Sequence, residues 1–202
     1  MTGGGAYALM DCVPGKTMNE LAYRNPDVLE QNRVRIAFQL GMHAAFSYVF
    51  GVKDGYQSNY LFDESTKTLT RVDNERFLQV PENPDETLSP GDAYTREIAA
   101  CEMENLKYIP SCRSGGDLDN VLKAFNTGFL EKYREMKERK ARMVELIRQA
   151  RGDAYAVTPG ADEGGYRSET DRIAAAVSCL VDQNPVDVLK RLYAARAECR
   201  KK

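Results

Sequence analysis

The stretch that decides the fold is GVKDGYQSNYLFDESTKTLTRVDNE, residues 51–75, because the hydropathy pattern of the chain changes there. Residues 36–50 before it are apolar almost all round, which predicts a helix buried in the middle of the domain. Inside it, the short apolar runs 60–62 and 69–72 flank a polar turn and predict a β-hairpin. Residues 75–91 after it contain three prolines and predict a long irregular loop. The sequence therefore predicts a helical body that carries a small hairpin.

Helix-start and helix-stop signals surround this stretch. Asn25-Pro26-Asp27 places a capping residue, a proline and an acid at a helix start, and this helix is expected to end near Phe50, before Gly51. His43 lies in its apolar half and is expected to be buried and hydrogen-bonded. Further helices are predicted over residues 16–22, 92–108, 118–151 and 173–181 and from Asn184-Pro185 onward, with a glycine-containing loop over 152–167.

The composition fits one ordinary globular domain of 202 residues. Its 28 Lys and Arg residues nearly balance 30 Asp and Glu, so the formal net charge is −2. This balance excludes a chain whose whole surface binds nucleic acid, and no strong nucleic-acid signal is present elsewhere. A hydrophobic share of 43% is enough for a core and argues against general disorder. The expected fold class is mainly α with a small β-hairpin.

The cysteines and the single histidine bear on metal binding and on the compartment. The five cysteines are odd in number and never form a C-x-x-C pair. A structural zinc site and a disulfide framework are therefore not expected, and reduced thiols predict a cytoplasmic protein. The chain has no run of about 18 apolar residues and no signal-peptide pattern, so no transmembrane segment is expected.

Three polar side chains in and beside the hairpin suggest phosphoryl chemistry. Asp54 follows the buried helix, Asn59 comes five residues later, and Asp73 follows the second strand. Phosphoryl transfer from a nucleotide needs one carboxylate to orient the acceptor hydroxyl, and an amide oxygen with a second carboxylate to hold Mg²⁺. Because a hairpin would bring these positions to one edge, Asp54 is the candidate catalytic residue, and Asn59 and Asp73 are the candidate metal ligands.

The same residues resemble the catalytic and metal-binding loops of the phosphatidylinositol 3-/4-kinase-like superfamily, which includes type II phosphatidylinositol 4-kinases and actin-fragmin kinase-type protein kinases. The family pattern is G-[hydrophobic]-x-D-R-H-x-x-N, a short hairpin, and then hydrophobic-D-[FN]-G. The resemblance extends from about Tyr7 to Phe77 and implies a protein-kinase-like C-terminal lobe, which is an α+β fold. It also implies ATP and Mg²⁺ as cofactors, and the same roles for Asp54, Asn59 and Asp73.

The segment before the first helix resembles a kinase hinge, which implies contacts with adenine. The backbone groups that would make these contacts belong to Met10, Asp11, Cys12 and Val13. Lys53 lies beside Asp54 and is a candidate phosphate contact, with a solvated loop lysine as the equal alternative. The expected organisation is a disordered lead at residues 1–6, the hinge-like segment at 7–15 and the kinase-like large lobe at 16–202.

Three departures from the family pattern leave the activity open. Gly55-Tyr56 stands where the family has Arg-His, and Glu75 stands where it has Gly. No small lobe is recognisable before Tyr7. The chain is therefore an ATP- and Mg²⁺-dependent kinase that needs a small lobe supplied from upstream, or a catalytically inactive pseudokinase-like scaffold. In a third reading it is an unrelated helical interaction protein, in which the candidate residues only shape turns.

The acceptor is a protein or a phosphoinositide. Residues 75–91 occupy the place of the substrate-recognising loop and lack the basic cluster that an inositol phosphate would favour, which tilts the expectation toward a protein or small-molecule acceptor. The basic stretch at residues 132–151 is expected to be a solvated helix face, with peripheral membrane or nucleic-acid contact as the alternative.

Overall fold

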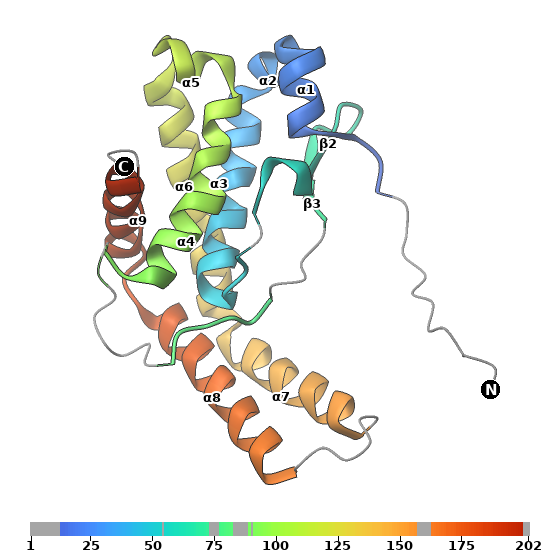
Figure 1. The fold of residues 1–202 in the computed structure, drawn as a ribbon, viewed down its shortest axis with the longest axis vertical. Coiled ribbons are helices and arrows are strands. Elements are labelled where there is room, and N and C mark those ends of the chain that lie inside the picture. Colours follow the sequence, from blue (N-terminus) through green and yellow to red (C-terminus); the bar gives the residue numbers. More distant parts are fainter. Residues whose placement is uncertain are drawn as a thin grey trace, which may run out of the picture.

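The computed structural model describes residues 13–53, 55–72, 77–82, 89, 91–156 and 163–199. Within these ranges the chain is mostly helical and carries a three-stranded antiparallel sheet (Figure 1). The elements before residue 90 are β1 (Lys16–Thr17), α1 (Met18–Arg24), α2 (Pro26–Gln31), α3 (Arg33–Phe50), the 3₁₀ turn η1 (Gln57–Asn59), β2 (Tyr60–Asp63) and β3 (Thr68–Arg71). Those that follow are α4 (Ala93–Glu102), the 3₁₀ segment η2 (Met103–Tyr108), α5 (Pro110–Ser114), α6 (Leu118–Glu138), α7 (Lys140–Ala156), α8 (Glu163–Asp182) and α9 (Pro185–Cys199).

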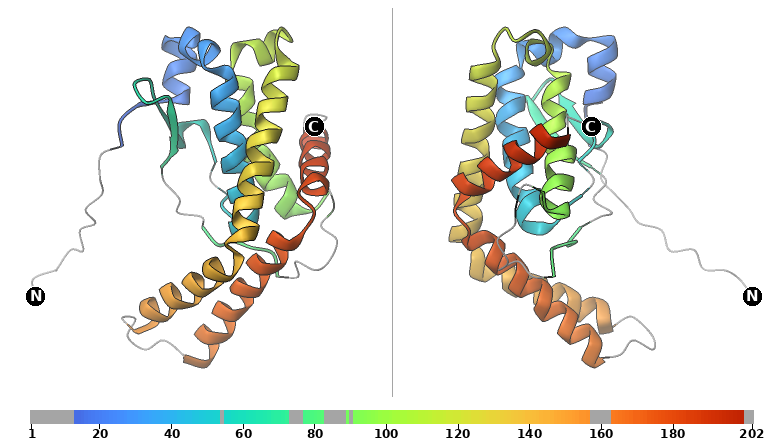
Figure 2. Two further views of the ribbon diagram at one scale, coloured as in Figure 1. Left: turned by 180° about the vertical axis from the view of Figure 1, so that it is seen from behind. Right: turned by 60° about the vertical axis from the view of Figure 1, so that its left-hand side comes forward.

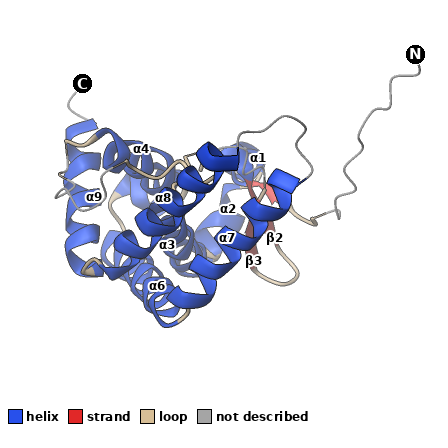
Figure 3. Cartoon of the chain, turned by 90° about the horizontal axis from the view of Figure 1, so that it is seen from below, coloured by secondary structure: helices blue, strands red, loops and turns tan. Residues whose placement is uncertain are grey.

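The predicted hairpin is confirmed and belongs to a slightly larger sheet. Strands β2 and β3 pair antiparallel, with Phe62 opposite Leu69. The short strand β1 adds a third strand on the other side of β2, with Lys16 opposite Phe62. A two-residue strand has no detectable alternation of its own, so only its pairing with β2 defines it. Seen from below, the sheet lies at one edge of the helical body (Figure 3), where it contacts α1 and α3.

Local signals explain where the first helices begin and break. Thr17 and Glu20 form a capping box at the start of α1, in which the Thr17 hydroxyl accepts from the Glu20 N–H at 3.1 Å. The single helix expected from Pro26 to Phe50 is in fact two, because the chain leaves helical geometry at Asn32. The side-chain amide of Asn32 donates to the Val28 carbonyl at 2.8 Å, and the Asn32 backbone N–H donates to the same carbonyl at 3.2 Å, so Asn32 closes the end of α2.

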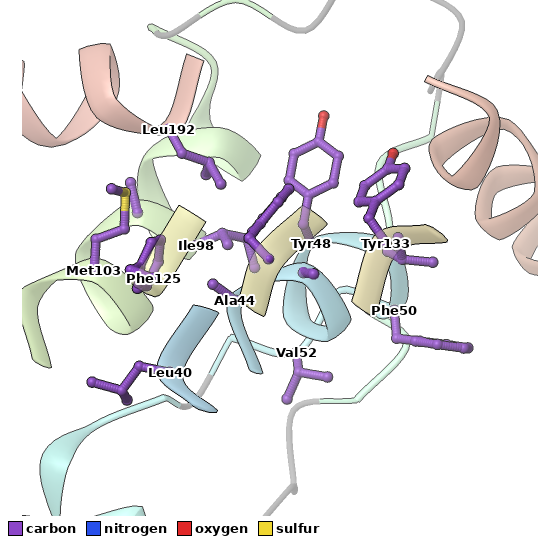
Figure 4. Packing of buried hydrophobic residues seen from close by; sticks show 14 of the residues in the cluster. Leu40, Ala44, Tyr48, Phe50, Val52, Ile98, Met103, Phe125, Tyr133 and Leu192 are labelled. Atoms are coloured by element: carbon purple, nitrogen blue, oxygen red, sulfur yellow. The ribbon is translucent and has the colours of Figure 1, made fainter. Parts of the chain in front are cut away.

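The most extensive contact between helices joins α3 and α6, which lie side by side in Figure 1. Two glycines allow this close approach, because a Cβ on Gly41 would stand 2.0 Å from the Phe125 carbonyl oxygen, and one on Gly128 would stand 1.9 Å from that of Phe38. Apolar side chains of α3, α4, α6 and α9 complete a common core layer, which includes Leu40, Ala44, Ile98, Phe125 and Leu192 (Figure 4).

The second half of the chain differs from the expected pattern in two places. The helix expected over residues 118–151 is divided at Arg139 into α6 and α7. The loop expected over 152–167 is helical at both of its ends, since α7 continues to Ala156 and α8 begins at Glu163. Helices α7 and α8 pack along each other and extend away from the helical body (Figure 2). Packing of this kind outweighs the weak helix propensity of the glycines near the start of α8. The last helix begins at Asn184-Pro185 as predicted.

Candidate functional site

The C-terminal end of α3 is where the segments of the candidate site meet. Gly51 ends the helix in the left-handed region, with φ 60°, and its N–H donates to the Ser47 carbonyl. The Leu78 N–H donates to the Phe50 carbonyl at 2.9 Å, and the Gln79 N–H donates to the Gly51 carbonyl at 3.1 Å. The chain therefore returns to this helix end just after residues 73–76.

Most of the residues predicted from the sequence lie outside the described part of the chain. Asp54, Asp73 and the hinge positions Met10–Cys12 belong to this group. Val13, Lys53 and Asn59 are described. Val13 is half-buried and lies just before β1. Lys53 and Gly55, which flank Asp54, and Val72, which precedes Asp73, are also described, and their hydrogen bonds are given below.

Asn59 lies at the junction between the 3₁₀ turn η1 and β2. Its N–H donates to the Tyr56 carbonyl at 2.8 Å, and its side-chain Oδ1 accepts from the Ser58 hydroxyl at 3.1 Å. Its carbonyl accepts from the Val72 N–H at 2.8 Å. Val72 directly precedes Asp73, so this hydrogen bond brings the backbone before the second predicted metal ligand next to the first.

Lys53 is held by α4. Its Nζ lies 2.6 Å from Glu97 Oε2 and 5.5 Å from the centre of the Tyr94 ring, and its side chain is 17% exposed. A phosphate at this position would compete with the Glu97 carboxylate for the ammonium group. The predicted phosphate contact therefore stays a prediction, with Glu97 as its built-in competitor.

The carboxylate of Glu102 is fully buried and lies against Gly55 of the loop at residues 51–56. Its Oε1 accepts from the Ser47 hydroxyl at 2.5 Å and from Arg71 Nη1 at 2.7 Å. Its Oε2 accepts from the Tyr60 hydroxyl. Burial and the Glu102 charge raise the pKa of Tyr60 well above its usual value, so Tyr60 stays a neutral donor. The carboxylate thus joins α3, β2 and β3 to the end of α4. We call Ser47, Tyr60, Arg71 and Glu102 the Glu102 cluster.

The cluster also explains why residue 55 is glycine. A Cβ on Gly55 would lie 2.3 Å from Glu102 Oε1, so the carboxylate occupies the space that any side chain there would need. The guanidinium that pairs with this carboxylate comes from Arg71 of β3.

Two further residues hold the loop on both sides of Asp54. Asn105 Nδ2 donates to the Gly55 carbonyl at 2.7 Å and to the Cys101 carbonyl at 2.8 Å. The Cys101 thiol donates to the Lys53 carbonyl at 3.5 Å. Burial raises the pKa of this thiol, which keeps it protonated as a donor. One helical turn therefore fixes the backbone before and after residue 54.

The sequence interpretation did not single out Arg71, Glu102 or Asn105. A signal for the last two exists, because Ile98, Glu102 and Asn105 are spaced at i, i+4 and i+7 and so share the buried face of the segment. An acid and an amide on an apolar helix face indicate a buried polar cluster. Arg71 carried no such signal, because a strand end is often solvated.

Among the described residues, no group of three or more His, Cys, Asp and Glu side chains is arranged to hold a metal ion. Of the two predicted metal ligands, Asn59 is described, and its amide oxygen is a ligand type that Mg²⁺ accepts. The carboxylates that would complete such a site belong to residues 54 and 73, outside the described ranges.

No protein-family model, curated protein or solved structure matches this chain. In the described part, no helix is both long and apolar enough to cross a membrane. Function is therefore inferred from the residues and from their geometry.

Proposed function

We propose that this chain is the large lobe of an ATP- and Mg²⁺-dependent phosphotransferase that resembles the phosphatidylinositol 3-/4-kinase-like superfamily. The observation that carries the proposal is the hydrogen bond between the Val72 N–H and the Asn59 carbonyl. It supports a common site for Asn59 and Asp73, because the residue before Asp73 is paired with the residue that carries the amide ligand.

The order of elements adds support. A buried helix leads into a loop at residues 51–56, a hairpin follows, and the chain then returns to the end of that helix. Cys101 and Asn105 hold the carbonyl groups of Lys53 and Gly55, the two sequence neighbours of Asp54. Fixed neighbours suit a residue that orients an acceptor hydroxyl, since displacements near 1 Å strongly reduce rates.

The proposed roles follow from the chemistry of each side chain. Asp54 orients the acceptor hydroxyl and accepts its proton, and Asn59 and Asp73 hold Mg²⁺, which neutralises charge on the phosphates. Backbone groups at residues 10–13 contact adenine. Lys53 reaches a phosphate only if its ammonium leaves Glu97. The acceptor is a protein or a phosphoinositide, and the location is cytoplasmic.

A specific observation also favours the alternative, a non-catalytic pseudokinase-like scaffold. The space beside Gly55 is filled by the Glu102 carboxylate, so the loop cannot carry the arginine of the family pattern without rearrangement. Tyr56, which is 50% exposed, replaces the histidine that is thought to assist transition-state charge in the lipid kinases. A binding module would retain the loop anchors and lack phosphate transfer.

Nucleotide titration with Mg²⁺, followed by a phosphate-transfer assay in the full protein, tests the proposal. Asp54→Ala and Asp73→Asn should each reduce transfer by about 10²-fold or more, and Asp73→Asn should also weaken Mg²⁺-dependent ATP binding. Asp63→Asn is the matched control, since Asp63 caps the hairpin turn by accepting from Ser65 and Thr66.

Undiminished transfer in both variants would overturn the catalytic roles. Magnesium-dependent nucleotide binding that is sensitive to Asp73 but comes without transfer would support the scaffold. Absence of nucleotide binding in the full protein would exclude the kinase.

A further inference from the structure

A cavity lies beside the hairpin, and none of the described residues of the loop at 51–56 lines it. It has a volume of about 370 Å³ and lies between α3, β3 and α6. Its apolar wall is formed by Met42, Phe46 and Leu69, and its polar wall includes His43, Arg71 and Lys132. A space of this size and mixed lining suits a small molecule with an apolar body and a polar group.

The charged groups that line the cavity are all basic. Arg71 reaches it from β3 and Lys132 from α6, and no carboxylate is among its described lining residues. His43 is the third basic residue of the lining. Its Nε2 lies 3.1 Å from the Leu69 carbonyl, which only accepts, so Nε2 is the donor in this contact. Arg71 and Lys132 therefore offer positive charge to an anion, while the Nε2–H of His43 is already bonded to Leu69.

Arg71 provides the most specific evidence. Its side chain is only 4% exposed, and its Nη1 donates to Ser47 and to Glu102. Its Nε and Nη2 are buried and have no hydrogen-bond partner. These two atoms form the side edge of the guanidinium, whose parallel N–H groups match the two oxygens of a carboxylate or a phosphate. Buried donors without a partner are rare in folded proteins and require an explanation.

Lys132 supplies a second cation that a ligand could recruit. Its Nζ lies 2.9 Å from Glu135 Oε2, and the two side chains are 25% and 37% exposed. Partly exposed ion pairs of this kind are weak, so an anion in the cavity could share the ammonium at little cost.

We propose that this cavity binds an oxyanion, a phosphate monoester or a carboxylate, carried on a small apolar body. The Nε and Nη2 groups of Arg71 take two of its oxygens, Lys132 adds charge, and Phe46, Met42 and Leu69 contact the apolar part. This proposal does not depend on the phosphotransferase function, because the cavity is lined by none of the residues assigned to that chemistry.

The chain's single histidine provides a direct readout, since His43 lines the cavity and gives the only histidine signals in an NMR spectrum of protein without a histidine tag. Titration with phenyl phosphate, and separately with benzoate, should shift the His43 ring signals saturably. A shift by phenyl phosphate alone identifies a phosphate ligand, and a shift by benzoate alone identifies a carboxylate. Inorganic phosphate measures how much the apolar body adds.

Lys132→Gln should raise the half-saturation concentration of the probe by about tenfold, because it removes one charged hydrogen bond at a partly exposed position. Lys123→Gln, on the same helix but in a neighbouring groove, should leave it unchanged. Arg71→Lys, if it folds, should abolish saturation. The proposal is overturned if neither probe shifts the His43 signals, or if Lys132→Gln and Lys123→Gln have equal effects.

Discussion

The Glu102 cluster and the α7–α8 pair use charge in opposite ways. In the cluster, Arg71 and Glu102 are 4% and 0% exposed and are bound by neighbouring hydroxyls. Along α7 and α8, by contrast, Arg148 and Asp171 form an ion pair whose side chains are 56% and 59% exposed. The first pair joins four elements around a loop, while the second lies on the surface of a helix pair that extends from the body (Figure 2).

The difference shows that burial decides what an ion pair contributes. A buried charge whose partner is lost stays desolvated, and this usually costs about 3–5 kcal/mol. An exposed pair exchanges its partner for water and contributes at most about 1 kcal/mol. The loop at residues 51–56 therefore depends on the Glu102 cluster, whereas the position of α8 depends mainly on its apolar contacts with α7 and the core.

The largest effect is expected for Glu102→Gln. The substitution removes the charge that balances Arg71 and turns one acceptor into a donor that faces existing donors. We expect the free energy of unfolding to fall by about 3–5 kcal/mol, measured by urea denaturation. A loss below about 1 kcal/mol would mean that the cluster is not the anchor described.

The second-largest loss of stability is expected for Gly55→Ala, because the new Cβ would lie 2.3 Å from Glu102 Oε1. The carboxylate is held by several donors and cannot move freely, so we expect a loss of about 1–3 kcal/mol in the free energy of unfolding. The double variant Gly55→Ala with Glu102→Gln tests whether the two residues interact, since their effects should then not add. Additive effects would contradict the contact.

A pH-dependent effect is expected at His43, which packs edge-on to Tyr60 of the cluster. Burial lowers the pKa of His43 in the folded protein. Below about pH 6.5 the unfolded chain binds a proton that the folded chain does not, so stability falls as pH decreases toward the folded pKa. The slope from this group is at most about 1.4 kcal/mol per pH unit.

Urea denaturation of the wild type and of His43→Gln across this range isolates that slope, because other groups titrate alike in both. The wild type should lose more stability on acidification than the variant. Parallel curves would show that His43 is protonated in the folded state.

The smallest effect is expected for Asp171→Asn in the α7–α8 pair. The exposed ion pair with Arg148 should contribute less than about 1 kcal/mol to the free energy of unfolding, and its contribution should diminish further at high salt. Thermal denaturation at low and high salt measures it. A loss as large as that of Glu102→Gln would remove the distinction between the two regions.

Local features of the fold were predictable. The apolar runs 60–62 and 69–72 nearly coincide with β2 and β3, and Gly51 ends α3 as expected. His43 forms the expected hydrogen bond. The strands and the helix stop depend on signals within a few residues, such as alternation or a left-handed glycine, whereas the partner of His43 lies 26 residues away. The breaks at Asn32 and Arg139 were missed because the apolar spacing continues across both of them.

The candidate site stays a prediction, and the contacts of its described residues could not be predicted from the sequence. Asn59 was proposed as a metal ligand, but its hydrogen bond to Val72 depends on the pairing of the hairpin. The interaction of Lys53 with Glu97 crosses 44 residues of sequence, and that of Arg71 with Glu102 crosses 31. Charged residues in a sequence usually indicate solvated positions, so no local pattern marks such buried partners.

The sequence by itself determined a mainly helical domain, the hairpin and the helix stop before it. These follow from backbone preferences and periodicity, which act over one or two turns. The candidate residues Asp54, Asn59 and Asp73 came instead from their chemistry and from the family resemblance, and their roles stay predictions. Only the tertiary structure decided that a carboxylate from α4 fills the space beside Gly55, and that the side edge of Arg71 is left without a partner at a cavity. Both depend on which side chains lose contact with water, and burial is a property of the packed chain rather than of any segment.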